Sequence, residues 1–237
     1  TYARVSRYGL IAYASSFDQI GPLTNNVSDA ALILEVIAGK DDFDSTVSKK
    51  DVDNYSTAKF DNKPKKIAYI SECLNRKGLD SEVKEFIENK INKLKSEGHI
   101  VVPISFPYLD LLVSTYYVLT TAEASSNLAR FDGVHYGYRS ENITDLESTY
   151  INSRTEGFGE EVKRRIMLGT FVLSSGYYDA YYTKAQKVRR LIRDDYTKVF
   201  DKVDVILTPT SPIVPFKIGE KLTDPLQMYM ADVCTVP

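Results

Sequence analysis

The sequence has few of the features that mark specialised classes of protein. Its 237 residues include two cysteines and no tryptophan, and no His or Cys lies at ligand spacing near Cys73 or Cys234. A disulfide framework and a zinc cage are therefore excluded, and a reducing cytosol is the compartment that fits. No apolar run approaches the roughly 20 residues that cross a bilayer, so the sequence contains no membrane-spanning segment.

Neither sign of charge is in large excess. The chain has 30 Lys+Arg against 32 Asp+Glu, a formal net charge of -2 and a pI near 5.8. Binding of nucleic acid through phosphates alone needs a basic surface, so we expect any RNA partner to be held by other means. The 43% hydrophobic and 26% charged residues are typical of a globular protein with a sizeable core.

The common motifs of nucleophilic catalysis and phosphate binding are missing. No serine lies in a G-x-S-x-G motif, and the 12 glycines include no Gly-Gly pair. His99 and His135 have no spacing that indicates a catalytic triad, and we interpret both as structural. Ser48 beside Lys49 lies in a polar segment, and we interpret it as a solvated surface pair.

A strand, a helix and a second strand place the chain in the α/β class. Residues 66–70 and 99–104 are predicted strands. Between them, apolar residues recur at helical spacing until Gly98: Val83, Phe86, Ile87, Ile91 and Leu94. This order predicts a crossover that connects two parallel strands.

Other segments are predicted from their caps and periodicity. Asn26 or Ser28 is expected to cap a helix that ends at Gly39, with Val27, Ala31, Leu34 and Ala38 on one face. Further elements are helices over 108–128 and 160–200, the second interrupted at 174–176, and a strand over 203–207. Three segments are expected outside helices. Residues 7–22 are predicted to form a loop with a short strand, and residues 40–63 a weakly ordered polar connection on the surface. Residues 131–155 are predicted to form a turn and a polar stretch.

The second half of the long helical region carries many aromatic residues. An apolar row is predicted to pack it against a core: Tyr181, Ala185, Val188, Ile192, Tyr196 and Val199. Tyr177, Tyr178, Tyr181 and Tyr182 form a cluster that an RNA-stacking surface would also contain. RNA-stacking sites are normally flanked by basic residues, but here basic residues only follow the cluster. We therefore expect the cluster to lie in the core and between helices.

Three long runs resemble the amidase signature family. They are RVSRYGLIA at 4–12, SSFDQIGP at 15–22 and VKRRIMLG at 162–169. The segments 129–134 and 173–182 are similar, more narrowly, to the A subunits of bacterial glutamyl-tRNA(Gln) amidotransferases. The resemblance covers essentially residues 1–237 and is weakest over 40–62. One departure is Ala3, where the family usually has Gly.

The resemblance implies a fold, an activity and partners. The implied fold is a mixed β-sheet covered by α-helices on both faces, present over residues 1–237 as a single partial amidase signature domain. The implied activity is a glutaminase, whose ammonia a partner subunit uses to amidate glutamyl- or aspartyl-tRNA. The implied partners are the B and C subunits of a heterotrimer, with the aminoacyl-tRNA, ATP and Mg handled mainly by the B subunit. No cofactor is expected on this chain itself.

The resemblance also implies that the catalytic residues lie elsewhere. The family uses a Ser nucleophile, activated through a second Ser and a Lys, and all three would precede Thr1. The absence of a Gly-Gly pair, after which the family places its nucleophile, agrees with this. We therefore expect the chain to be an internal fragment without hydrolytic activity of its own.

Three residues match substrate-binding positions of the family. Arg165 corresponds to the arginine that binds the glutamine carboxylate, which suits a guanidinium fork, although spacing alone does not separate it from Arg164. Asp232 corresponds to an acid for the ammonium, and Tyr116 to a tyrosine whose hydroxyl reaches the substrate, with Tyr117 equally compatible by composition. We expect Arg165 and Asp232 to converge on one cavity.

Two other functions remain compatible with the sequence. A free-standing amidase of small neutral amides would not need Arg165 and Asp232, because its substrate has no charged ends. A non-catalytic assembly module would only dock onto partner subunits. Which amidated tRNA the assembly makes is also left open.

Overall fold

The computed structural model describes the chain except residues 1, 59–62, 77, 221–227, 229–230 and 237. By its internal contacts the chain divides into two compact units. Unit 1 contains Thr1–Asp61 and Thr120–Leu173, and unit 2 contains Asn62–Leu119 and Ser174–Pro237. That the whole chain belongs to one partial domain of the full-length protein stays a prediction.

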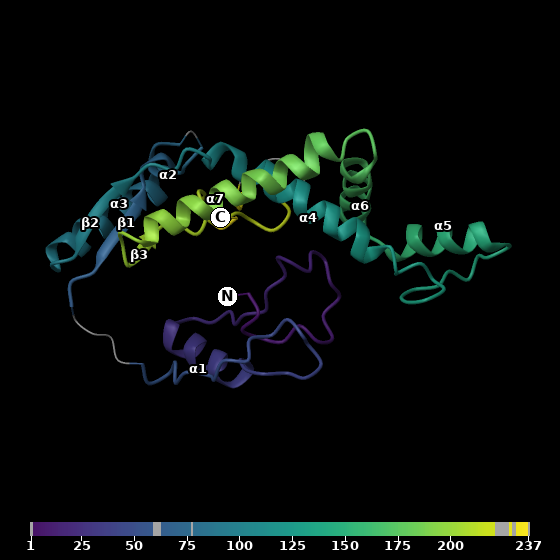
Figure 1. Cartoon of the computed structure of the whole chain (residues 1–237), viewed down its shortest axis with the longest axis horizontal. Helices are drawn as coiled ribbons and strands as arrows, with labels where there is room; N and C mark the ends of the chain where they lie inside the picture. Colours follow the sequence, from purple (N-terminus) through teal and green to yellow (C-terminus); the bar gives the residue numbers. More distant parts are fainter. Residues whose placement is uncertain (1, 59–62, 77, 221–227, 229–230, 237) are drawn as a thin grey trace. The chain divides into compact units, whose positions relative to one another are not determined.

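Unit 2 is built on a three-stranded sheet. β1 (Lys66–Ile70) lies between β2 (Ile100–Ile104) and β3 (Val205–Leu207), and both pairings are parallel (Figure 1). α3 (Ser81–Ser96) connects β1 to β2, which confirms the predicted strand, helix and strand. The resemblance implied a mixed sheet, but these strands are all parallel because helices, and no tight hairpin, join each to the next along the chain.

Helices cover both faces of this sheet. Alternate residues of a strand point to opposite faces, and Ile67 and Ile70 of β1 accordingly belong to different apolar clusters. Ile67 packs with Ile91 of α3, whereas Ile70 packs with Ile192 of α7 (Lys184–Phe200). The expectation of helices on both faces is thus confirmed for the strands described.

The predicted break in the long helical region is also present. α6 (Glu160–Leu173) ends at Leu173, a turn follows, and the π-helical segment η2 (Asp179–Thr183) leads into α7. The tyrosines of this region do not lie in the core, so that prediction was wrong. Their rings pair with one another, Tyr177 with Tyr181 and Tyr178 with Tyr182, and all but Tyr182 are exposed by 41 to 46%.

Unit 2 also contains two short helical elements and the first part of a longer helix. α2 (Ser71–Asn75) follows β1 and was not predicted, since five residues give no periodicity. A 3₁₀ turn, η1 (Leu109–Leu111), leads into α4 (Leu112–Leu128), as the prediction of a helix over 108–128 requires. α4 contributes residues to both units.

In unit 1, the first helix begins where its cap predicts. α1 (Val27–Ile37) starts after Asn26, whose side chain accepts the backbone N–H of Asp29 at 2.8 Å. Gly39 follows its end with φ +133°, a conformation that favours glycine. The expected apolar face is not covered, however: no residue of α1 is buried, and Val27 is 79% exposed.

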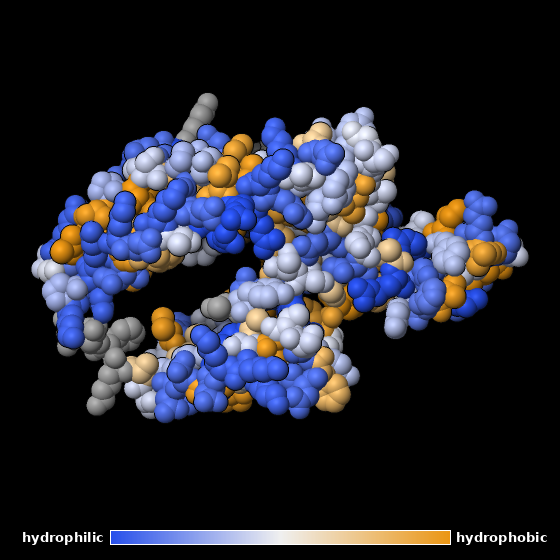
Figure 2. All heavy atoms as spheres, viewed as in Figure 1, coloured by the Kyte–Doolittle hydropathy of each residue, from blue (hydrophilic) through white to orange (hydrophobic). Residues whose placement is uncertain are grey.

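α5 (Leu146–Gly157) lies in the stretch predicted to be a turn and polar loop. It begins with a capping box between Asp145 and Ser148, and its buried residues are Thr149 and Ser153. Apolar side chains are instead exposed on it, as the scattered hydrophobic surface of α5 in Figure 2 shows. A helix that buries hydroxyls has no apolar stripe by which the sequence would reveal it.

The polar connection predicted at 40–63 is more ordered, in its described residues, than expected. Its described residues form no helix or strand, but Val47 is buried. Arg4 donates hydrogen bonds to the carbonyls of Lys50 at 2.9 Å and Asp51 at 2.5 Å, and to the Tyr55 hydroxyl at 2.8 Å. Contacts with the start of the chain thus order a segment whose own composition does not.

Candidate functional site

Arg165 of α6 forms hydrogen bonds with Glu161 and Tyr13, which both belong to unit 1. Its Nε donates to Glu161 Oε1 at 2.8 Å, and its Nη1 donates to the Tyr13 hydroxyl at 3.0 Å. The guanidinium also lies over the Tyr13 ring, 5.4 Å from the centroid. Burial by itself lowers the pKa of Arg165, but the hydrogen bonds to Glu161 and Tyr13 outweigh it and raise the pKa above the ordinary value. Arg165 is therefore a fixed, fully charged cation.

The structure separates Arg165 from Arg164, which spacing alone does not. The Arg165 side chain is 25% exposed, whereas that of Arg164 is 55% exposed. Both pair with Glu161, which lies three and four residues earlier on the same helix. Of the two, Arg165 is the one positioned to present its charge from a partly desolvated surface.

A tight turn positions Tyr13 for this contact. The Asp18 carboxylate accepts the backbone N–H groups of Tyr13 at 3.0 Å and Ala14 at 3.1 Å. Asn127 of α4 donates to the Tyr13 carbonyl at 3.1 Å, and Ser16 donates its hydroxyl and its N–H to Glu123 of the same helix. The run at 15–22, which carries the family resemblance, therefore helps to anchor Tyr13 to α4.

α6 itself is fixed against α4 at close range. A Cβ added at Gly169 would lie 2.0 Å from the Thr121 carbonyl oxygen and 2.6 Å from the Ser125 Cβ. The hydroxyls of Ser125 and Thr170 are 3.0 Å apart beside this contact. Since Arg165 lies one turn before Gly169, this packing sets the position of the Arg165 backbone.

The other two predicted substrate residues belong to unit 2. Tyr116 lies half-buried on α4, with its ring edge-on to Tyr117 at 5.1 Å between centroids. Asp232 is exposed in a turn, where its carbonyl accepts the N–H groups of Thr235 at 2.9 Å and Val236 at 3.1 Å. Asp232 thus lies at the surface of unit 2. That Asp232 and Arg165 converge on one cavity stays a prediction.

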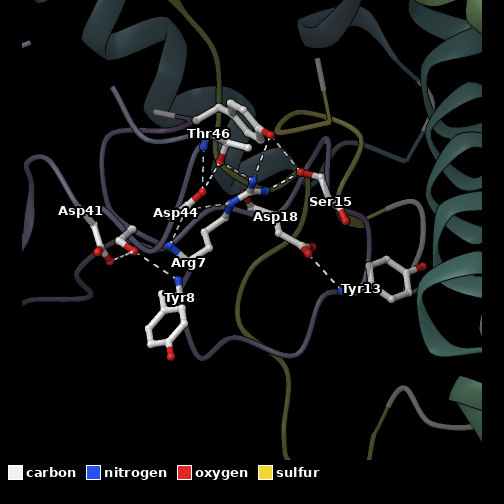
Figure 3. A network of polar contacts seen from close by, with 10 residues as sticks. Arg7, Tyr8, Tyr13, Ser15, Asp18, Asp41, Asp44 and Thr46 are labelled. Atoms are coloured by element: carbon white, nitrogen blue, oxygen red, sulfur yellow. Dashed lines mark hydrogen bonds and ion pairs between the residues drawn. The ribbon is translucent and has the colours of Figure 1, made fainter. Parts of the chain in front are cut away.

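A second polar network in unit 1 surrounds Arg7 (Figure 3). Its guanidinium donates to the Ser15 carbonyl, the Tyr2 hydroxyl at 3.1 Å and the Thr46 hydroxyl at 2.7 Å. The Asp44 carboxylate accepts the Arg7 backbone N–H at 2.9 Å. Hydrogen bonds from Thr46 and Arg7 lower the pKa of Asp44 to about 2.

This network joins the start of the chain to the polar connection. A cleft of about 200 Å³ lies beside it, and Tyr8, Phe43 and Asp18 are among its lining residues. The described residues that line it do not include Tyr116, Arg165 or Asp232. Because Arg7 and Asp44 already bind parts of this chain, we interpret them as structural.

The remaining candidates have structural contacts. His99 Nδ1 accepts the Lys65 N–H at 3.0 Å, and His135 Nδ1 lies 2.8 Å from the Asp132 carboxylate, which also accepts the His135 N–H. The Ser48 hydroxyl accepts the Lys50 N–H at 3.3 Å in an irregular turn, and Lys49 is exposed. These contacts agree with the structural interpretation of each.

The described part of the chain lacks two further kinds of feature. It contains no helix long and apolar enough to cross a membrane. It also contains no group of three His, Cys, Asp or Glu side chains arranged to hold a metal ion.

Sequence reasoning did not predict Glu161 and Tyr13 as partners of Arg165. Glu161 lies four residues before Arg165, and this spacing on a helix is a signal for an ion pair. Tyr13 gives no comparable signal, because 152 residues separate it from Arg165 and only the fold brings them together.

Comparisons with known proteins show which proteins the whole chain is similar to. The Amidase family matches residues 1–237. The A subunit of the glutamyl-tRNA(Gln) amidotransferase from Chlorobium limicola is 56% identical over 243 residues, which cover 100% of this chain and 50% of that protein. Its counterpart from a Sulfurihydrogenibium species is 55% identical, with 100% and 49% covered. The chain thus spans about half the length of the curated relatives it matches.

Solved structures agree with the implied fold. The crystal structure of the glutamyl-tRNA(Gln) amidotransferase A subunit from Thermotoga maritima matches with a TM-score of 0.75 and 43% identity, covering 100% of this chain and 46% of that one. A peptide amidase from Stenotrophomonas maltophilia matches with a TM-score of 0.62 at 22% identity, over 88% of this chain and 44% of that one, which shows a shared fold alone. The predicted amidase signature fold is confirmed, and the chain covers 46% of the Thermotoga maritima structure.

Proposed function

The chain belongs to the amidase family, and from this premise we propose that its full-length protein is the glutaminase subunit of a glutamyl-tRNA(Gln) amidotransferase. The high identity to A subunits along the whole chain supports this over other family members. The full-length protein would hydrolyse the side-chain amide of glutamine. A partner subunit would use the ammonia to amidate Glu-tRNA(Gln), and in some assemblies Asp-tRNA(Asn).

The observation that carries the proposal is the fixed cation at Arg165. Glutamine differs from a simple amide by a carboxylate and an ammonium, so a glutaminase needs a group of each opposite charge. A guanidinium held by Glu161 and Tyr13 loses little further conformational freedom when it binds a carboxylate. A neutral amide would gain nothing from such a cation.

Asp232 and Tyr116 would complete the recognition of glutamine. Asp232 would bind the ammonium, and the Tyr116 hydroxyl would donate to the substrate. The exposure of Asp232 in a turn supports the first role. Tyr117 remains the alternative for the second role, because both rings are half-buried on the same helix.

The catalytic residues and partners belong to the proposal as well. The Ser-Ser-Lys set would lie in the part of the full-length protein outside these 237 residues, so we expect the purified chain to release no ammonia from glutamine. The partners would be B and C subunits in the cytosol, with ATP, Mg and most tRNA contacts on the B subunit. The net charge of -2 supports a minor role for this chain in holding RNA.

The test uses the full-length protein with Arg165→Ala and, as matched control, the neighbouring Arg164→Ala. Loss of a charge-assisted hydrogen bond of about 1.5–3 kcal/mol predicts that kcat/KM for glutamine falls by roughly 10- to 150-fold in Arg165→Ala. Hydrolysis of a simple aliphatic amide should change little in either variant. Unchanged hydrolysis of the simple amide and of glutamine in Arg165→Ala would instead support a free-standing amidase, which does not need Arg165.

The same preparation distinguishes an enzyme from an assembly module. A protein that only docks onto partner subunits would bind them and yet release no ammonia from glutamine in their presence. Ammonia release by the assembled wild type, lost on replacement of the nucleophilic serine, supports the glutaminase.

A further inference from the structure

The helix α1 has apolar side chains on two sides. On the side predicted to pack inward, Ala31 and Leu34 are partly buried. The opposite side is the outer face of α1, which consists of Leu32, Ile33, Val36 and Ile37. These four residues are 38 to 77% exposed. Because residues three and four apart are neighbours on a helix, they form one continuous apolar stripe.

Contacts on the inner side fix how α1 is rotated. The Glu35 carboxylate accepts the backbone N–H of Ser56 at 2.9 Å and the Ser56 hydroxyl at 2.7 Å. Directly after the helix, Ala38 forms an antiparallel bridge with Val5, which is buried. The helix therefore cannot turn its outer face inward without breaking these contacts.

The composition of α1 is that of a helix inside a core. A helix at the surface of a globular protein normally has one apolar side and one polar side, whereas a helix that is apolar all round is buried. Asp29 is the acidic residue nearest the outer face, and it lies in the first turn, where its carboxylate accepts the Asn26 side-chain amide at 2.8 Å. The surface that covers the outer face must therefore itself be apolar.

The size of the outer face favours a segment of the same polypeptide over a second copy of the chain. α1 has 11 residues, which make a helix about 16 Å long and about 10 Å wide. Two copies that met through this helix alone would bury on the order of several hundred Å², less than the roughly 1,000 Å² of a stable interface. A segment of the same polypeptide is present at an effective concentration of about millimolar, so a small apolar face is enough to bind it.

The chain spans 50% and 49% of the A subunits from Chlorobium limicola and the Sulfurihydrogenibium species. A full-length protein of that length has about as many residues again with which to cover α1. Unit 2 is a poorer partner, because the two faces of its sheet already pack against its own helices.

We propose that the outer face of α1 is a docking surface for the half of the full-length protein outside these 237 residues. Apolar side chains of that half cover Leu32, Ile33, Val36 and Ile37. Unit 1 thus supplies one side of a core that the other half completes. The proposal does not depend on the glutaminase activity.

The first experiment measures whether the outer face is covered. Val36→Cys is made in the full-length protein, purified without partner subunits, and its labelling by a maleimide is followed by peptide mass spectrometry. Asp42→Cys is the control, at a side chain that is 81% exposed. A covered thiol reacts only when the structure opens, so labelling at residue 36 should be at least about tenfold slower than at residue 42, with equal rates in urea.

Ile33→Cys repeats the measurement at a second residue of the outer face. Native labelling at residues 33 and 36 as fast as at residue 42 would overturn the proposal. Protection that is lost on dilution would show that a second copy covers the face, and protection that needs a partner subunit would assign the face to that subunit. Either result would also overturn it.

The second experiment identifies the segment that covers the outer face, and it needs no substitution. Full-length protein that contains photo-leucine, a diazirine analogue of leucine, is irradiated in a mixture with isotope-labelled copies, and its adducts are mapped by mass spectrometry. We expect Leu32 to join peptides from outside these 237 residues. Leu34, on the inner side, is the matched control and should join peptides of unit 1.

Other adducts of Leu32 would contradict the assignment. Adducts only with residues 62–119 or 174–237 would show that unit 2 covers the outer face. Adducts that combine labelled and unlabelled copies would show a dimer contact. Each of these results, or the absence of any Leu32 adduct outside the 237 residues, would overturn the proposal.

Discussion

Gly169 of α6 lies against the backbone carbonyl of Thr121 in α4, so closely that an added Cβ would be 2.0 Å from the carbonyl oxygen. Real Cβ atoms do not approach an oxygen to that distance, and the atom in the way is backbone and not the end of a mobile side chain. The absence of a side chain at residue 169 is thus the condition for this helix contact, and the helix contact in turn positions Arg165.

Gly169→Ala is expected to destabilise the full-length protein by more than about 2 kcal/mol, because α6 must move away from α4 or distort. The loss should appear as a lower urea midpoint. Gly176→Ala is the matched control, since a Cβ there meets nothing within 4 Å, and it should leave the midpoint nearly unchanged. A wild-type midpoint for Gly169→Ala would mean that the two helices are not in backbone contact.

Ala3 is expected to lower the stability of the fold, and replacement by glycine is expected to raise it. Its φ is 62°, in the left-handed region, where a non-glycine residue costs roughly 1–2 kcal/mol. Glycine loses more backbone entropy on folding, so Ala3→Gly should stabilise by a net of about 0.5–1 kcal/mol. Thermal unfolding measures the change. Ala30→Gly, inside α1, should show the opposite sign, and destabilisation by both would contradict the left-handed conformation at Ala3.

The sequence predicted the elements whose signal is local and periodic. β1, α3 and β2 follow from apolar spacing within about 40 residues, and the start of α1 follows from the cap at Asn26. α5 was missed because its buried residues are Thr149 and Ser153, which no apolar pattern marks. The capping box at Asp145 and Ser148 was the one signal available for it.

The sequence named candidate site residues, whose substrate roles stay predictions, but it did not name their partners. Arg165 came from the family resemblance, and its pairing with Glu161 was readable at helical spacing. Its contact with Tyr13 depends on a turn and a helix that only tertiary structure brings together. The order of the polar connection likewise arises from long-range bonds to Arg4 and Arg7, which composition does not encode.

Ile192 is expected to be among the most sensitive positions of unit 2. It is 9% exposed and joins α7 to the cluster beneath β1. Ile192→Ala should lower the free energy of unfolding by about 2–4 kcal/mol through lost burial and the cavity that remains. Leu191→Ala, one residue earlier and 44% exposed, is the control and should cost below about 1 kcal/mol. Equal losses would show that α7 does not face the sheet as described.

Asp44 is expected to make part of the stability of unit 1 depend on acid pH. Its pKa is about 2 in the folded chain against an ordinary value of 3.8. A lowered pKa favours the folded state above pH 3.8, and this contribution is lost as the pH falls from 3.8 towards 2. Asp44→Asn should therefore lower stability at pH 7 and give a shallower loss between pH 4 and 2. Asp42→Asn, at an exposed ion pair, should keep the wild-type slope.

Under the proposed glutaminase function, Tyr13 of the full-length protein is expected to tune glutamine binding through Arg165. Tyr13→Phe removes the hydroxyl that accepts from Arg165 Nη1 and keeps the ring under the guanidinium. The cation stays charged but is less firmly oriented, so the KM for glutamine should rise by roughly three- to tenfold with kcat little altered. Tyr8→Phe, in the same segment at a ring that is 69% exposed, should behave as wild type. A fall in kcat at unchanged KM would show that Tyr13 acts on the reaction itself and not by positioning Arg165.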